Sequence, residues 1–295
     1  MARIIAIANQ KGGVGKTTTS VNLAACLAVA EQKTLIVDLD PQGNASVALG
    51  VNHSTFTHAN VYHALIGETT AKDCIYGTDL DQLDICPSDN NLIGAEVELM
   101  NAFAREAKLK GFLDGIRDQY DFIIIDCPPS LSLLTVNGLN AADAFIVPMQ
   151  TEYFAMEGLA QLLNTVKLIQ QNLNPTLEME GIVLTMYDGR NNLSKLVAEE
   201  IKEHFPEKTF KSIVPRNVKL SECPSHGKPI ITYDITSKGS EAYLGLAKEV
   251  IFAQKARMDA KAEEEKKDAD LMDQIITKSD DNFTIPSFDD YRPAE

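Results

Sequence analysis

A glycine-rich stretch near the amino terminus, residues 8–19 with the sequence ANQKGGVGKTTT, constrains the fold of this 295-residue chain more than any other feature. It follows the short apolar run 3–8, which is typical of a buried strand, and it leads into residues 16–31, where apolar residues recur at helical spacing. A glycine-rich turn between a strand and a helix presents backbone N–H groups that bind phosphate. A turn without a ligand is the alternative, which the Gly-Lys-Thr sequence in this position disfavours.

The parts of this phosphate-binding loop have different expected roles. Its three glycines can take positive φ, which lets the backbone approach a ligand closely. Lys16 is expected to reach the β- and γ-phosphates of a nucleotide, and the Thr17 hydroxyl is expected to coordinate Mg²⁺. The expected nucleotide-binding residues of the loop are Lys11, Gly12, Gly13, Val14, Gly15, Lys16, Thr17 and Thr18.

The loop departs from the usual motif in two places. Gln10 stands where the ordinary pattern has glycine, and Lys11 follows it. Because the loop wraps its phosphates from the other side, we expect Lys11 to reach a phosphate that is held by a second subunit. A solvated surface lysine is the alternative.

Strand and helix patterns alternate over residues 1–255, which predicts a doubly wound α/β domain with a mostly parallel sheet and a ligand at the carboxyl ends of its strands. The later strands are expected at 34–40, 82–88, 121–126, 144–150, 180–187 and 210–215. The helices are expected at 16–31, 95–118, 131–141, 154–172, 192–204 and 238–255.

Residues 256–295 differ from the rest of the chain, with 12 acidic and 6 basic residues within a total net charge of −15. We expect this tail to extend the last helix and then to be disordered. The acidic charge disfavours a globally basic nucleic-acid binder but leaves room for a local basic patch. The chain has no apolar run long enough to span a membrane, and its five scattered cysteines are typical of a cytosolic protein.

Carboxylates follow two of the expected strands. Asp38 and Asp40 end the run 35–40, and Asp126 ends the run 121–126. Because residues two apart in a strand share a face, we expect Asp38 and Asp40 both to point toward the phosphates. One carboxylate would hold a Mg²⁺-bound water and the other would orient the attacking water, while Asp126 has the position of a Walker B residue. A solvent-facing acidic turn is the alternative for the Asp-X-Asp pair.

Over residues 1–253 the chain resembles the ParA/MinD superfamily of P-loop ATPases, which have a deviant Walker A loop. Within it, the chain is similar to ParA/Soj-type chromosome-partitioning ATPases. The resemblance rests on the motifs KGGVGKT, DLDPQGN, IDCPPS, TMYDGR and PRNVKLSECPSHGKPI. It implies that Lys11 crosses a nucleotide-sandwich dimer, that Asp40 is tied to hydrolysis, and that Lys11, Lys16 and Asp40 are the catalytic residues. Glu152 and Tyr153 take dimer-interface positions.

The resemblance also implies two further groups of site residues. The residues implied near the adenine base of the nucleotide are Met186, Pro215, Arg216 and Asn217. The implied metal-site residues are Thr17, Asp38 and Asp126. Those that bind the DNA backbone without reading its sequence are Arg190, Arg216 and Lys219, for each of which an ordinary surface role is the alternative.

The function implied by the resemblance is an ATP-driven switch. ATP and Mg²⁺ would bind each monomer, and two monomers would close into a homodimer that binds DNA non-specifically. Slow hydrolysis, stimulated by a ParB-type partner protein, would then release the DNA. We expect a cytoplasmic, nucleoid-associated protein without a membrane partner.

Three rival functions remain open at this point. A MinD-like membrane ATPase would need a basic amphipathic carboxyl-terminal helix, and this tail is acidic. An iron–sulfur reductase of the nitrogenase iron-protein type would need cysteines that bridge two subunits, for which Cys127 is the candidate. An ATP-switched positioning protein for another cargo would share all the motifs above.

Overall fold

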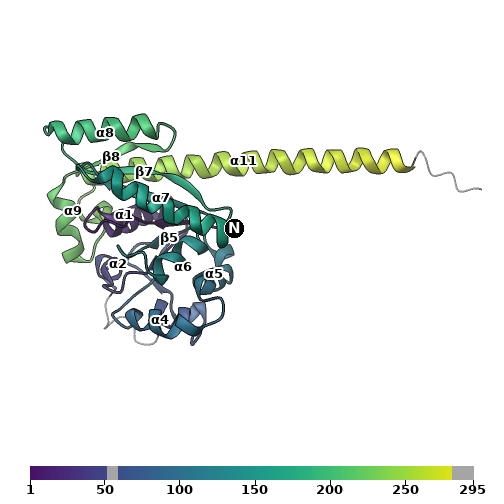
Figure 1. Cartoon of the computed structure of the whole chain (residues 1–295), viewed down its shortest axis with the longest axis horizontal. Coiled ribbons are helices and arrows are strands. Elements are labelled where there is room, and N and C mark those ends of the chain that lie inside the picture. Colours follow the sequence, from purple (N-terminus) through teal and green to yellow (C-terminus); the bar gives the residue numbers. More distant parts are fainter. Residues whose placement is uncertain (52–58, 281–295) are drawn as a thin grey trace, which may run out of the picture. The chain divides into compact units, whose positions relative to one another are not determined.

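The computed structural model describes the backbone of residues 1–51 and 59–280, and side chains as far as residue 267. Figure 1 shows the order of the elements along the chain. The strands are β1 (Arg3–Ile7), β2 (Thr34–Asp38), β3 (Tyr76–Gly77), β4 (Leu83–Cys86), β5 (Phe122–Asp126), β6 (Ala144–Gln150), β7 (Glu178–Tyr187) and β8 (Thr209–Pro215). The helices are α1 (Lys16–Val29), α2 (Asn44–Ala48), α3 (Val61–Ile66), α4 (Leu92–Glu98), α5 (Lys108–Asp114), α6 (Leu133–Ala141), α7 (Ala155–Asn172), α8 (Asn192–His204), α9 (Val218–Glu222), α10 (Ile230–Tyr233) and α11 (Lys238–Asp280).

The strands form one sheet in the order β3-β4-β2-β5-β1-β6-β7-β8. All neighbouring pairs are parallel except β3 with β4, so the short edge strand β3 is the one antiparallel element among the described residues. The expected α/β fold with a mostly parallel sheet is therefore confirmed. Because β5 lies between β1 and β2, the chain segments that leave the carboxyl ends of these three strands meet at one edge.

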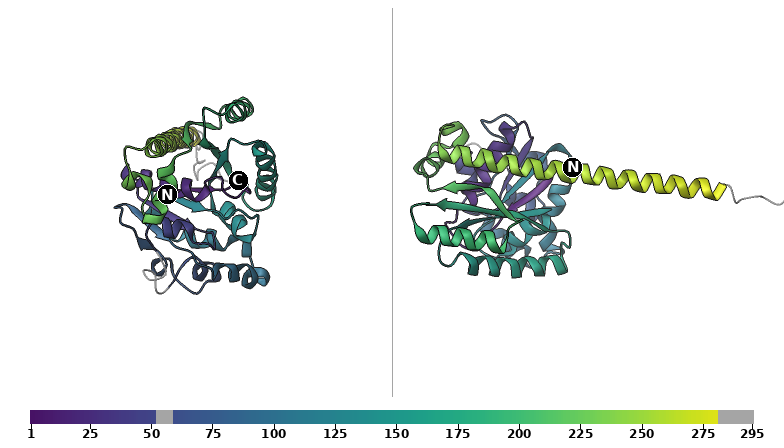
Figure 2. Two further views of the ribbon diagram at one scale, coloured as in Figure 1. Left: turned by 90° about the vertical axis from the view of Figure 1, so that its left-hand side faces the viewer. Right: turned by 90° about the horizontal axis from the view of Figure 1, so that it is seen from above.

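Buried residues cover both faces of the sheet. Ile4 and Ala6 of β1 point into a core cluster that includes residues of α3, α5, α6 and α7. The alternate residues Ile5 and Ile7 are equally buried and point to the opposite face, where α1 packs on β2 and β5. The right-hand view of Figure 2 has helices on both sides of the strands. Burial on two faces explains why these strands are continuous apolar runs.

The single helix expected over residues 95–118 is wrong. Helix α4 ends at Glu98, Ala104 has a φ of +50°, and α5 begins only at Lys108. Two asparagines of α6 bind the backbone of this interruption: Asn137 accepts from Leu109 N at 3.1 Å, and Asn140 donates to the Glu106 carbonyl at 2.7 Å. Tertiary hydrogen bonds therefore override an unbroken helical pattern here.

The strand expected over 34–40 ends two residues early, at Asp38. Leu39 N still donates to the Asp126 carbonyl at 2.9 Å, but Asp40 N turns back and donates to the Asp38 carboxylate at 3.1 Å. Asp38 and Asp40 thus do not share a strand face as predicted, and their surroundings differ.

The chain divides into two compact units, Met1–Glu249 and Val250–Glu295. The expected extension of the last helix is confirmed, since α11 continues to Asp280. The segment 281–295, for which we expect disorder, lies outside the described residues. Within the described part of the chain, none of the helices combines the length and the apolar character that a membrane crossing requires.

Candidate nucleotide-binding site

The glycine-rich loop connects β1 to α1 as predicted, and two of its glycines have the expected backbone. Gly13 has a φ of +73° and Gly15 a φ of +86°, whereas Gly12 does not take positive φ. Gly15 is the amino-terminal cap of α1, and no side chain caps this helix. The first N–H groups of α1 are therefore available to an anion, which is the arrangement that binds phosphate.

Lys16 lies in this loop with only 7% of its surface exposed. Its Nζ donates to the Lys11 carbonyl at 3.1 Å. Burial lowers the pKa of Lys16, while the charges of Asp126, Cys127 and Asp40 act in the opposite direction. A buried ammonium group with a single hydrogen bond to the loop is well placed to exchange that bond for phosphate oxygens.

Lys11 points away from the loop and pairs with Glu152 of the same chain. Its Nζ lies 2.6 Å from Glu152 Oε2, and the second carboxylate oxygen accepts from Gln150 Nε2, also at 2.6 Å. The two charged side chains are 37% and 48% exposed. The neighbouring Tyr153 and Phe154 are 77% and 63% exposed, and their rings contact edge to face at 5.1 Å. Lys11 is thus part of an exposed, aromatic surface patch.

Two buried carboxylates meet at the carboxyl edge of the sheet. Asp38 and Asp126 pair in register between β2 and β5, and both are fully buried. Burial raises the pKa of Asp38 to about 6, although Ser46 donates to its Oδ2 from both N and Oγ. Burial and the charge of Asp38 raise the pKa of Asp126 to about 7, against the opposing effect of the Ser20 and Thr17 hydroxyl groups.

The arrangement around Asp126 fits a divalent cation. Ser20 Oγ donates to its Oδ1 at 2.7 Å, but Oδ2 is buried without a hydrogen-bond partner in the described structure. A buried, unpaired carboxylate oxygen close to the Thr17 hydroxyl is the kind of oxygen donor that Mg²⁺ takes, directly or through water. Asp38 fits less well as a direct ligand because Ser46 and the Asp40 N–H already bind both of its oxygens.

Asp40 is the third carboxylate of this edge and is 9% exposed. Its Oδ1 accepts from Gln42 N at 3.0 Å, which leaves Oδ2 free of any hydrogen bond recorded for the described residues. Asp40 also acts electrostatically on Lys16 and Asp126. Asp38 and Asp40 are both buried, so the alternative of a solvent-facing acidic turn is wrong for this Asp-X-Asp pair.

A cavity of about 310 Å³ opens beside Gly15 and Thr18. The structure brings all four residues predicted for the base to this cavity, which is lined among others by Met186, Pro215, Arg216 and Asn217. Met186 has a φ of +50°, a strained conformation for a residue with a side chain. Asn217 uses Oδ1 to cap α9, accepting from Lys219 N at 2.8 Å. Its amide nitrogen remains as a donor toward a ligand.

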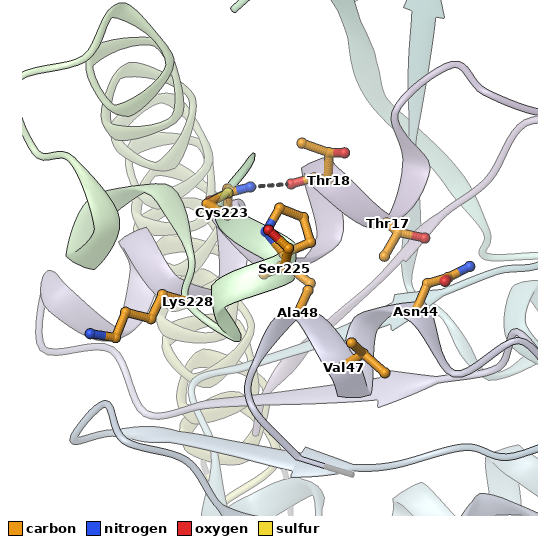
Figure 3. Close-up of a pocket in the computed structure, with 11 residues that line it drawn as sticks. Thr17, Thr18, Asn44, Val47, Ala48, Cys223, Ser225 and Lys228 are labelled. Atoms are coloured by element: carbon orange, nitrogen blue, oxygen red, sulfur yellow. Dashed lines mark hydrogen bonds between the residues drawn. The ribbon is translucent and has the colours of Figure 1, made fainter. Parts of the chain in front are cut away.

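A second cavity, of about 360 Å³, lies on the other side of Thr18 (Figure 3). Thr17 and Asn44 lie at one end of it, and Lys228 at the other. Asn22 is one of its lining residues and joins two parts of the site. Asn22 Nδ2 donates to the Thr18 carbonyl, and Ile230 N donates to Asn22 Oδ1, both at 2.7 Å. Asn22 therefore anchors the segment 218–233 to the phosphate-binding helix.

The predicted DNA-binding residues are only partly brought together. Arg190 is 91% exposed and forms a two-point ion pair with Asp188, at 2.8 and 3.0 Å. Hydrogen bonds from Arg190 and the charge of the nearby Arg216 lower the pKa of Asp188 to about 2. Lys219 instead pairs with Glu222 at 3.1 Å. Arg190 and Arg216 thus flank one carboxylate, while Lys219 has a different partner.

Sequence reasoning missed several residues of the site. Ser20, Asn22, Ser46 and Thr185 all bind the loop or its carboxylates, and Thr185 Oγ1 donates to the Val14 carbonyl at 2.8 Å. The sequence contained a signal for two of these residues. Ser20 stands one helical turn after Lys16, and Thr185 lies near the end of the apolar strand β7. Cys127, the candidate for a bridging ligand, is 1% exposed, and burial raises its pKa, so it offers no thiolate to a second subunit.

Comparisons with known proteins identify relatives of this chain. A family model described as an AAA domain matches residues 2–179. The sporulation initiation inhibitor protein Soj of Bacillus subtilis is 54% identical over 250 residues, which are 85% of this chain and 98% of that protein. The chromosome partitioning protein ParA of Myxococcus xanthus is 53% identical over 85% of this chain and 88% of its own length.

A solved structure extends the likeness to three dimensions. Cobyrinic acid a,c-diamide synthase from Mycobacterium smegmatis, with bound ADP and magnesium, superimposes with a TM-score of 0.76 at 35% identity. The match covers 86% of this chain and 96% of that one. Together with the matched AAA domain and the two bacterial relatives, this likeness shows that the chain belongs to the ParA/Soj family of P-loop ATPases.

Proposed function

We propose that this protein is a chromosome- or plasmid-partitioning ATPase that binds ATP and Mg²⁺, closes into a nucleotide-sandwich homodimer, and then binds DNA of any sequence. The observation that carries the proposal is the direction of the Lys11 side chain, which points away from its own loop and pairs with Glu152 on an exposed patch. The names of the relatives, a chromosome partitioning protein and Soj, support the partitioning role.

The chain's own residues divide the chemistry of ATP hydrolysis among them. Lys16 and the N–H groups at the start of α1 would hold the phosphates, and Thr17 with Asp126 would hold Mg²⁺, which would supply positive charge beside the phosphate oxygens. Asp40 has an oxygen free to orient the attacking water. Asp38 positions the segment that carries Asp40, because it binds the N–H groups of Asp40 and Ser46.

The exposed patch around Lys11 is suited to a second protomer. Tyr153 and Phe154, which follow Glu152 in the chain, expose 77% and 63% of their surface, and aromatic residues are enriched in protein interfaces. A Cβ added at Gly12 would meet nothing within 4 Å in the protomer. A need for glycine there would therefore come from the partner's approach. In the dimer, Lys11 would leave Glu152 and neutralise the partner's triphosphate.

DNA binding would follow from dimerisation. A single Arg190–Arg216 pair, partly neutralised by Asp188, is a weak phosphate site. Two such pairs on one dimer raise the avidity without a new contact. Hydrolysis, stimulated by a ParB-type partner, would open the dimer and release the DNA, so that the protein is associated with the nucleoid only in its ATP-bound form.

The test is ATP-dependent dimerisation of the full-length protein, measured by analytical ultracentrifugation with ATP, with ADP and without nucleotide. Lys11→Ala should abolish the ATP-dependent dimer and leave ATP binding to the monomer. The exposed Lys167→Ala on α7 is the control and should dimerise normally. Dimers of Lys11→Ala that match the wild type in affinity would refute the role of Lys11 across the interface.

The rival functions predict different results in the same preparation. A MinD-like membrane ATPase would sediment with phospholipid vesicles in ATP, which we do not expect from an acidic tail. A positioning protein for another cargo would dimerise with ATP but would not respond to a ParB-type protein encoded nearby. Retention of the ATP-bound protein on DNA of random sequence, lost at high salt, supports the partitioning function.

A further inference from the structure

Four large apolar side chains on and just after α4 are exposed. Ile93, Val97, Met100 and Phe103 expose 57%, 67%, 56% and 94% of their surface. Their spacing of three to four residues places the first three on one helical face. We call these four residues the α4 stripe. Exposed apolar side chains that gather on one helical face are typical of interaction sites.

The fold does not need the α4 stripe for its own core. The opposite face of the same segment provides the buried residues Leu92, Ala95 and Leu99, which are at most 3% exposed. The segment is therefore anchored without the stripe. Serine or lysine at the four exposed positions would leave these buried contacts in place, so the apolar residues are suited to something outside the chain.

The α4 stripe lies in the most acidic part of the α/β unit. Residues 60–106 contain nine acidic and two basic residues, a net charge of −7 within the total of −15. Glu96 and Glu98 flank the stripe on α4, and Tyr62 Oη donates to Glu98 at 2.9 Å. The other charges that act on the Tyr62 hydroxyl are also carboxylates, those of Glu68 and Asp89. This surface repels nucleic acid and anionic membranes.

We propose that the α4 stripe binds an amphipathic helix of a partner protein that carries lysine or arginine beside its apolar face. The apolar side chains of such a helix would cover Val97, Met100 and Phe103, and its basic residues would meet the carboxylates of the rim. This pattern, an apolar strip in a complementary charged frame, is a common mode of helix recognition.

The α4 stripe is connected to the ATPase site by a short chain of contacts. Ser88, which precedes α4 by four residues, donates its N–H to Ser46 Oγ at 3.1 Å, and the same hydroxyl donates to Asp38 at 2.8 Å. Gly43 is packed against the Ser88 carbonyl, since a Cβ there would lie 2.9 Å from that oxygen. A partner that shifts α4 would therefore move the segment between Asp38 and Ser46. This second step rests on the proposed ATPase function, whereas the docking itself does not.

The docking is tested without nucleotide, by fluorescence anisotropy of a labelled synthetic helix with leucines on one face and lysines along its flanks. A second peptide has the same leucines and glutamates in place of the lysines. We expect the basic peptide to bind the full-length protein and the acidic one not to. The double variant Val97→Ser with Phe103→Ser should weaken binding at least about tenfold, the loss typical of two central anchors.

The control variant is Leu168→Ser on α7, which removes an apolar residue of similar exposure, 60%, elsewhere on the surface. It should bind the basic peptide like the wild type. Equal binding of the peptide to the stripe variant and to the control would overturn the proposal, because net charge alone would then explain the binding. The proposal would also be overturned if the wild type self-associated without nucleotide and the stripe variant did not, because the α4 stripe would then bind a second copy of this chain.

The coupling to the ATPase has its own readout. The basic peptide should change the ATP turnover of the wild type at least about twofold and leave the stripe variant unchanged, while the basal turnover of both proteins stays equal. Peptide binding without an effect on turnover would refute the link through Ser88 and Ser46 and leave the docking site intact. A wild type without any ATP turnover would instead contradict the proposed function.

Discussion

Replacement of Asn22 tests how the site is held together, because this buried side chain joins α1 to the segment that lines the base cavity. Asn22 is 2% exposed, donates to the Thr18 carbonyl and accepts from Ile230 N. In Asn22→Ala the N–H of Ile230, a fully buried residue, loses its hydrogen-bond partner. An unsatisfied buried donor costs about 1–3 kcal/mol, and the removed amide adds about 1 kcal/mol. We expect a loss of roughly 2–4 kcal/mol of unfolding free energy.

Asn172→Ala is a matched control for this variant. Asn172 Nδ2 makes the same type of bond, at 2.8 Å, to the carbonyl four residues earlier in its helix. Unlike Asn22, Asn172 is exposed, and its Oδ1 accepts no hydrogen bond among the described residues. Its replacement should change the unfolding free energy by less than about 0.5 kcal/mol. Urea unfolding followed by circular dichroism measures both variants, and the Asn22→Ala midpoint should fall by about 1 M at an unchanged slope.

The same variant should also weaken ATP binding, since the residues Pro215–Ser221 around the base are tied to α1 through Asn22. Isothermal titration with a non-hydrolysed ATP analogue checks this. Unfolding midpoints of Asn22→Ala and Asn172→Ala that agree within about 0.2 M would refute the reasoning, because the bond to Ile230 N would then contribute no more than a surface bond.

Three further perturbations separate chemistry, DNA binding and packing. Asp40→Ala should lower ATP turnover at least about tenfold and let the ATP-bound dimer accumulate; undiminished phosphate release would contradict its role. Arg190→Glu with Arg216→Glu should abolish retention on DNA in an electrophoretic assay and spare the ATP-dependent dimer, and retention that persists at moderate salt would place the DNA surface elsewhere. Gly138→Ala puts a Cβ 2.9 Å from a buried sulfur and should lower the unfolding free energy by about 1–3 kcal/mol in thermal melts. The control Gly158→Ala, with nothing within 4 Å, should be neutral or stabilising, and equal melts for the two would refute the packing argument.

The sequence alone predicted three features of this protein. They are the residues of the phosphate-binding loop, the alternation of strands and helices, and the carboxylates at the strand ends. Each depends on a local signal: the two-residue or 3.6-residue apolar period, or the fixed spacing of Gly15, Lys16 and Thr17. A parallel sheet then brings the ends of β1, β2 and β5 to one edge, so that Asp38 and Asp126 become neighbours without any further information.

Only the tertiary structure decided which groups are already engaged and which are free. Ser46 binds the carboxylate of Asp38, whereas Asp126 keeps an unpaired oxygen. Lys11 pairs with Glu152, which lies 141 positions later in the chain. Asn137 of α6 helps to break the helix that the pattern favours at 95–118. These contacts join side chains that are distant in the sequence, and their energies depend on burial and geometry that no local period records. The exposure of the α4 stripe was likewise not predictable from the sequence, because an apolar helical face has the same sequence pattern whether or not the chain covers it.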